Sequence, residues 1–197
     1  MFVQCPYCQE SHDILALEPS FGRPDAFLEL NRRDDVQVRD SKDSCAVRSA
    51  DDSWRRYFLR VLVPFTVLSV EKPVSWGAWV EITEEQHSRV EELWDSPKQS
   101  SGPPFTGRFA NALHGYQDTL DITGLVSLTD PSNIPTFHMI APGDNQFVRE
   151  QQSLVSPQRV AEWLVPIYHG NSLREQGAQE NESPVTAAGK RWWQFWL

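Results

Sequence analysis

The cysteines and one histidine near the start of the chain constrain its fold most strongly. Cys5 and Cys8 are separated by two residues, His12 follows shortly after, and Cys45 is the third and last cysteine. A C-x2-C turn points two thiolates at a single ion, and thiolate and imidazole are the donors that tetrahedral Zn²⁺ prefers. We therefore expect Cys5, Cys8, His12 and Cys45 to hold a structural zinc ion, with no position left for water or substrate.

A redox function is the main alternative for the Cys5 and Cys8 pair. Thioredoxin-like C-x-x-C motifs lie between a strand and a helix. Here Gly22 and Pro24 follow the motif, and the segment between lacks helical periodicity. The sequence therefore favours a metal turn over a redox pair.

Charge and cysteine content limit the partners and the compartment. The net charge is -9 and the isoelectric point is near 5.0, so we expect no nucleic-acid binding, which needs clustered lysine and arginine. A partner with a basic surface suits this charge better. No apolar run reaches the length of a transmembrane segment, and the first residues lack a signal region. With three cysteines and a C-x2-C turn, these features predict a cytoplasmic protein.

Alternating apolar residues predict a sheet-rich α+β domain. We expect a mainly antiparallel sheet, two principal helices and a zinc-knuckle-like turn at the N-terminus. The predicted strands are 36–39, 45–47, 57–63, 76–82, 105–113, 119–128 and 135–140.

Two helix starts are well marked in the sequence. Thr83 and Gln86 form a capping box that begins a helix running to about Trp94. Ser156 followed by proline begins a second helix, which we expect to end at Gly170. These elements define a single predicted domain over residues 1–170, with the metal-binding turn inside 1–50.

The remaining residues divide into a linker and an aromatic tail. Residues 171–189 are polar and lack apolar periodicity, so we expect a linker. Residues 190–197 contain Trp192, Trp193 and Trp196, whose apolar surface is too large to be left exposed to water without a function. The tail is expected to dock on its own domain, on a partner protein or at a membrane interface, and the sequence leaves these alternatives open.

Several motifs in order resemble a bacterial family known as domain of unknown function 2199. Cys5-Pro6-Tyr7-Cys8-Gln9-Glu10-Ser11-His12 resembles its C-x2-C-G-x-x-H start, with Gln9 in place of glycine. Further matches are Asp43-Ser44-Cys45, Trp76-Gly77-Ala78-Trp79-Val80, Glu92-Leu93-Trp94-Asp95 and Gly115-Tyr116-Gln117-Asp118-Thr119-Leu120. A second departure is Asn145-Gln146-Phe147-Val148, where the family has a histidine-containing segment. The resemblance implies a zinc-ribbon-like start on an α+β domain and assigns no activity.

The outer face of the first predicted helix is strongly acidic and is the candidate partner-binding surface. It carries Glu84, Glu85, Glu91, Glu92 and Asp95. Such a face is commonly only solvated, but it also attracts cationic proteins. With the missing catalytic motifs, it leads us to expect a non-enzymatic protein-binding domain stabilised by structural zinc. The specific expectation is an immunity protein that neutralises a bacterial toxin or effector with a basic surface.

An enzyme is the competing class. In one version His12 does not coordinate, so zinc keeps an open position for hydrolytic chemistry. In the other, His114, Tyr116 and Asp118 gather a base, a phenol and a carboxylate near a turn. Gly115 and Asp118 are also ordinary turn residues, and we favour that interpretation.

Overall fold

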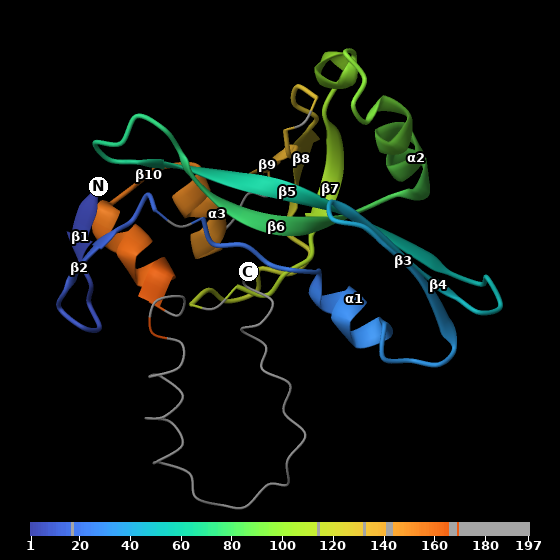
Figure 1. The fold of residues 1–197 in the computed structure, drawn as a ribbon, viewed down its shortest axis with the longest axis horizontal. Helices are drawn as coiled ribbons and strands as arrows, with labels where there is room; N and C mark the ends of the chain where they lie inside the picture. The colour runs from blue at the N-terminus through green and yellow to red at the C-terminus, as the bar shows by residue number, and fades with distance from the viewer. Residues whose placement is uncertain (17, 114, 132, 141–143, 166–168, 170–197) are drawn as a thin grey trace, which may run out of the picture.

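The computed structural model describes residues 1–197 except 17, 114, 132, 141–143, 166–168 and 170–197. The elements are arranged around one curved sheet, with the N-terminal strands at one end and the β3–β4 hairpin at the other (Figure 1). In chain order they are β1 (Phe2–Gln4), β2 (Ser11–Asp13), α1 (Asp25–Leu30), β3 (Val36–Asp40), β4 (Ser44–Ser49), β5 (Arg55–Val67), β6 (Val74–Ile82), α2 (Glu84–Leu93), the 3-10 turn η1 (Gln99–Ser101), β7 (Phe105–Phe109), β8 (Thr123–Ser127), β9 (Thr136–Met139), α3 (Gln146–Gln151) and β10 (Leu154–Val155).

The main sheet closes on itself. Its strand order is β3-β4-β5-β6-β7-β8-β9, and every neighbouring pair along this path is antiparallel. Strand β9 then returns to β5 in parallel, where Leu62 lies opposite Thr136. Strand β10 also pairs with β5 in parallel. The α+β class is confirmed, but the mainly antiparallel sheet is only partly right, because parallel pairing closes β5 to β9 into a mixed barrel.

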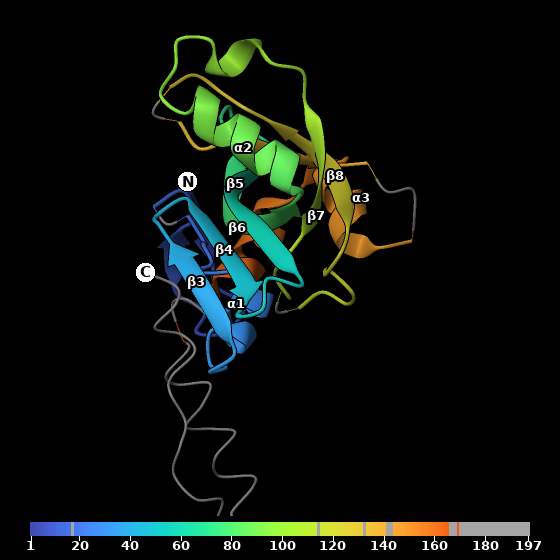
Figure 2. The ribbon, with the colours of Figure 1, turned by 90° about the vertical axis from the view of Figure 1, so that its right-hand side faces the viewer.

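The part of the sheet outside the barrel has a helix on each face. Along β4, Cys45 and Val47 point toward α1, whereas Ser44, Ala46 and Arg48 point to the opposite face, beside α2. Side chains of a strand alternate between faces, so this division follows directly from the register of β4 on β5. Figure 2 shows α1 and α2 on the two sides of these strands.

The two faces have separate hydrophobic cores. The larger core fills the barrel with residues from all five of its strands, including Val61, Val80, Phe109, Val126 and Phe137. The smaller core lies between α1 and the outer strands and contains Phe27, Cys45, Val47, Phe58, Trp79 and Ala110. Trp76 belongs to the larger core and Trp79 to the smaller one, so both indoles are buried although they lie on opposite faces of β6.

The helices outnumber the two that the sequence predicts. The capping box of α2 is present, and residues 157–165 are helical after Ser156, as expected. The short helix α3 begins at Asn145, whose side-chain oxygen accepts hydrogen bonds from the backbone N–H of Phe147 and Val148. No helix in the described part of the chain is long and apolar enough to cross a membrane. The expected helix end at Gly170, the linker and the aromatic tail lie outside the described residues.

The capping box should contribute measurably to stability. The Thr83 hydroxyl accepts the backbone N–H of Gln86, and the Gln86 side chain accepts the backbone N–H of Thr83. We expect Thr83→Ala to lower the unfolding free energy by about 1 kcal/mol and the midpoint by roughly 2–4 °C in thermal denaturation. Ser88→Ala, at an exposed position of the same helix, is the control. Equal midpoints for Thr83→Ala and the wild type would contradict this assignment.

Candidate metal centre and the groove beside α2

Four soft or borderline donors converge at the N-terminal end of the molecule. The ligand atoms of Cys5, Cys8, His12 and His169 all lie within 4.8 Å of one another. The Cys8 Sγ is 3.2 Å from His12 Nε2, and the Cys5 Sγ is 3.4 Å from His169 Nε2. Ligands of a tetrahedral ion with bonds of about 2.0–2.3 Å are separated by about 3.3–3.8 Å. These four residues lie close enough to hold one metal ion.

The turn between the two cysteines is built by backbone hydrogen bonds. The Gln9 N–H donates to the Cys5 carbonyl, and the Cys5 N–H donates to the Glu10 carbonyl. The Glu10 N–H also lies 3.4 Å from the Cys8 sulfur. Gln9 has a φ of 63°, the left-handed conformation that glycine adopts most easily. This explains the glycine preference at this position, and Gln9 satisfies the turn at some backbone cost.

The thiols of the cluster are close enough to affect one another. Desolvation raises the pKa of the Cys8 thiol, and the neighbouring Cys5 thiol raises it further. A bound cation reverses this preference because it binds the thiolate and releases the proton. A bound cation would therefore stabilise the two neighbouring thiolates of Cys5 and Cys8.

The strands β1 and β2 and the turn between them, residues 2–13, form the N-terminal hook, and its packing places it beside His169. Strands β1 and β2 form an antiparallel pair in which Val3 lies opposite His12. Val3 and nearby Ile14 are buried in the same core cluster as Val160 and Leu164 of the helical residues 157–165. Figure 1 shows β1 and β2 beside this helix. His169, which is distant in the sequence, thus lies beside the three donors near the N-terminus.

Cys45 does not lie in this group, which corrects the expected ligand set. It is buried in β4, opposite Phe58 of β5, in the core beneath α1. Figure 1 places β4 at the far end of the sheet from β1 and β2. Burial raises the pKa of Cys45 to about 12, so it stays a protonated thiol at neutral pH. His169 takes the fourth place, and no sequence motif near it indicates this role.

The predicted acidic surface divides into two parts. Glu84 pairs with Arg55 and accepts a hydrogen bond from Tyr57, while Glu91 lies 2.9 Å from Arg39. These two carboxylates are on the side of α2 that faces the sheet. Among the residues that the structure describes, the other three acids make no ion pair: Glu85, Glu92 and Asp95. The predicted contact residues Trp192, Trp193 and Trp196 lie outside the described part.

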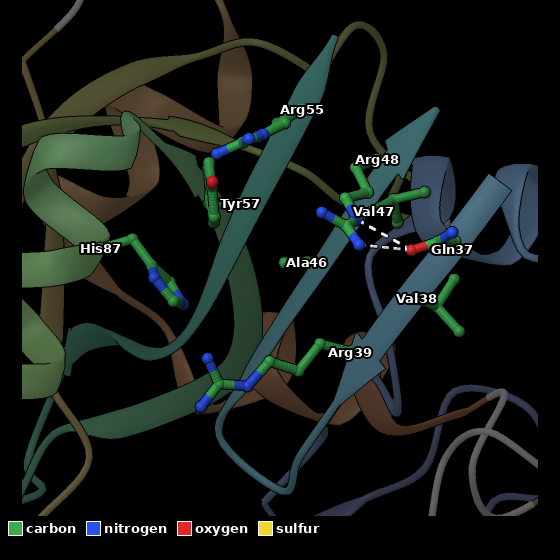
Figure 3. A pocket seen from close by; sticks show the side chains of 9 residues that line it. All are labelled: Gln37, Val38, Arg39, Ala46, Val47, Arg48, Arg55, Tyr57 and His87. Carbon is green, nitrogen blue, oxygen red and sulfur yellow. Dashed lines mark hydrogen bonds between the residues drawn. The ribbon is translucent and has the colours of Figure 1, made fainter. Parts of the chain in front are cut away.

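A groove lies between α2 and the strands β3 to β5. One hollow, of about 320 Å³, is lined by Arg39, Arg48, Arg55, Tyr57 and His87 among others. Figure 3 shows Arg39 reaching across from β3 toward His87. The adjoining hollow, of about 530 Å³, is lined by Arg39, Ser41, Lys42, Asp43, Ser44, Leu59, Val90, Glu91 and Trp94. This groove lies beside the acidic helix, and the sequence analysis did not identify it.

The second expected catalytic group is not assembled as a site. Tyr116 donates a hydrogen bond to Glu150, packs against Phe147 and lies under the guanidinium of Arg159. Burial and the Glu150 carboxylate raise its pKa. The Asp118 carbonyl accepts a hydrogen bond from Asn145. Tyr116 and Asp118 thus have structural partners, and His114 lies outside the described residues.

By its fold and its cluster of donors, the protein is an α+β domain with a candidate metal centre made of two cysteines and two histidines. A family model described as "Uncharacterized protein conserved in bacteria (DUF2199)" matches residues 4–154. The chain belongs to this family. No curated protein and no solved structure matches the chain. The matched residues include three of the four donors but not His169.

Separate alanine substitutions of His169 and Cys45 test which of the two residues is the fourth ligand. We expect His169→Ala to weaken metal binding at least about 100-fold, since even outer-shell partners of ligands contribute 10–100-fold. Cys45→Ala should keep the full metal content and lose only about 1 kcal/mol of packing. Competition with a chelator of known affinity measures the first, and chemical denaturation the second. Metal loss in Cys45→Ala with retention in His169→Ala would reverse the assignment.

Proposed function

We propose that this chain is a zinc-stabilised protein-binding domain in which the ion has a structural role. The observation that carries this proposal is the convergence of Cys5, Cys8, His12 and His169. Four protein donors complete a tetrahedron, so no coordination position remains for water or substrate. The ion would hold the N-terminal hook against the end of the chain that carries His169.

The donor chemistry favours zinc among the available ions. Two thiolates and two imidazoles form a set that tetrahedral Zn²⁺ binds in structural sites, whereas Mg²⁺ and Ca²⁺ require oxygen ligands. When bound, zinc supplies a crosslink and no redox chemistry. The residues of this chain supply the thiolates, orient the two rings and bury one sulfur, that of Cys5.

The unpaired carboxylates of α2 support a cationic protein as the partner. Glu85 and Glu92 are seven residues apart and therefore share one side of the helix, and Asp95 follows the helix end. Exposed like charges raise the association rate with a surface of opposite sign and favour one orientation. Neutralisation of a basic bacterial effector domain is the role that we propose for this surface.

Metal analysis tests the structural role of zinc. We expect about one zinc per chain by elemental analysis and a tetrahedral absorption spectrum after cobalt substitution. Removal of zinc with a chelator should lower stability by about 4 kcal/mol, or roughly 8–16 °C, if the free ion is present at a thousand times its dissociation constant. A cobalt spectrum showing a bound water, or a midpoint unchanged by the chelator, would contradict the proposal.

Charge reversal tests the partner surface. The probe is each basic effector domain encoded beside the gene, co-expressed with this chain and measured by calorimetry. We expect Glu85→Lys with Glu92→Lys to weaken binding at least about tenfold and to reduce its salt dependence. Glu71→Lys with Glu18→Lys, at exposed acids outside α2, is the matched control. Equal weakening in both double variants, or binding to none of the domains, would overturn this part.

A further inference from the structure

Three residues beside the groove have the mutual geometry of a nucleophile, a base and an orienting acid. The Ser44 Oγ lies 2.9 Å from His87 Nε2. The other ring nitrogen, His87 Nδ1, lies 3.5 Å from Glu91 Oε2. We propose that Ser44, His87 and Glu91 form a hydrolytic site for small carboxylic esters, in addition to the binding function proposed above.

The fold holds each member on a regular element. Ser44 begins β4 opposite Leu59, and the alternation that buries Cys45 under α1 turns Ser44 toward α2. His87 and Glu91 are four residues apart on α2, so they are neighbours on its surface. The capping box fixes the start of this helix, and burial of His87 and Val90 sets the side that faces the sheet. Ser44 is also held by the β3–β4 turn, where its N–H donates to the Ser41 hydroxyl and its carbonyl accepts from the same hydroxyl.

The carboxylate beside the ring favours the tautomer that the reaction needs. The Glu91 carboxylate lies 3.5 Å from His87 Nδ1 and can only accept, so it favours a neutral imidazole with the proton on Nδ1. In that tautomer Nε2 accepts from the Ser44 hydroxyl, 2.9 Å away. Burial and the positive charge of Arg39 lower the pKa of His87, whereas Glu91 and Glu84 raise it. The Tyr57 ring packs on the imidazole with centroids 4.7 Å apart. The net lowering keeps His87 neutral at pH 7 and able to accept a proton.

The adjoining cavity indicates the substrate class. The hollow of about 530 Å³ is lined by Ser44 and Glu91, and the adjoining hollow of about 320 Å³ is lined by His87. Leu59, Val90 and Trp94 supply an apolar wall that suits a short acyl chain. Arg39 lines both hollows and pairs with Glu91 at 2.9 Å, so its guanidinium is a candidate group to stabilise negative charge on a carbonyl oxygen.

The reaction is an acyl transfer in two balanced steps. The Ser44 Oγ attacks the ester carbonyl while His87 Nε2 takes the hydroxyl proton. The carbon–oxygen bond to the alcohol then breaks, and His87 returns the proton to the leaving alcohol. Water attacks the resulting acyl-serine while His87 again accepts a proton, the bond from the acyl carbon to Ser44 Oγ breaks, and His87 returns the proton to Oγ as the carboxylic acid leaves. Ester and water are consumed, and acid and alcohol are produced.

This site is physically separate from the metal centre and from the partner surface. The reacting groups face the sheet side of α2, whereas Glu85 and Glu92 lie on its other side. The metal donors are at the opposite end of the molecule (Figure 1). Variants at Ser44 should therefore retain zinc, and failure of one proposal leaves the other testable.

Covalent labelling with a fluorophosphonate tests the nucleophile directly. The reagent forms a phosphorus–oxygen bond to the serine, loses fluoride and passes the hydroxyl proton to the base. We expect one adduct on the peptide containing Ser44 in the folded, zinc-loaded full chain, detected by mass spectrometry. Ser44→Ala should give none, and His87→Gln should label at least about 100-fold more slowly. Ser88→Ala, on the same helix and outside the site, should label at the wild-type rate.

Ester hydrolysis and a folding control complete the experiment. With p-nitrophenyl butyrate, kcat/KM should fall at least about 100-fold in Ser44→Ala, and Glu91→Gln should lower kcat with little change in KM. Circular dichroism and zinc content must match the wild type in each variant. If His87→Gln does not fold, Glu91→Gln supplies the test of the base. Labelling elsewhere than Ser44, or equal rates in Ser44→Ala and wild type, would overturn the proposal.

Discussion

The alternation of side chains along β4 is the constraint on which the groove beside α2 and the core beneath α1 both depend. Cys45 points into the core beneath α1, and the preceding residue, Ser44, points into the groove beside α2. A slip of one residue in the pairing of β4 with β5 would exchange these two destinations. Paired positions such as Cys45 with Phe58 hold that register because both side chains are fully buried. The register that buries Cys45 beneath α1 is thus the same one that places the Ser44 hydroxyl beside His87.

Local patterns were enough to predict most of the regular elements. Alternating apolar residues and runs of β-forming residues located β3 to β9, and the capping box located the start of α2, because these signals arise from neighbouring residues. Closure of the barrel was not predictable in this way, since the parallel contact of Leu62 with Thr136 joins distant strands. The short helix α3 was missed as well, although Asn145 is a strong capping residue. Its six residues carry too little periodicity to be distinguished from a turn.

Of the four donors in the candidate metal centre, the sequence predicted the three that are close together in the chain. Cys5, Cys8 and His12 share a short segment, so spacing alone indicated that they meet. The error was to complete the set with the last cysteine, because counting donors ignores where the fold carries them. His169 is 164 residues from Cys5, and only the packing of the N-terminal hook on the helical residues 157–165 brings them together. The groove beside α2 has the same origin, since Ser44 and His87 lie on different elements.

The chain order of the four donors has a consequence for biosynthesis. Cys5, Cys8 and His12 emerge from the ribosome first, and His169 emerges only after the whole sheet has been made. An ion captured early by the nascent chain would have three protein ligands and an exchangeable water in the fourth place. Arrival of the last imidazole would then expel that water and lock the two ends together. If this cluster binds an ion, completion of the site would therefore wait for synthesis of residue 169, and a chain cut short before it would leave the ion with three protein ligands.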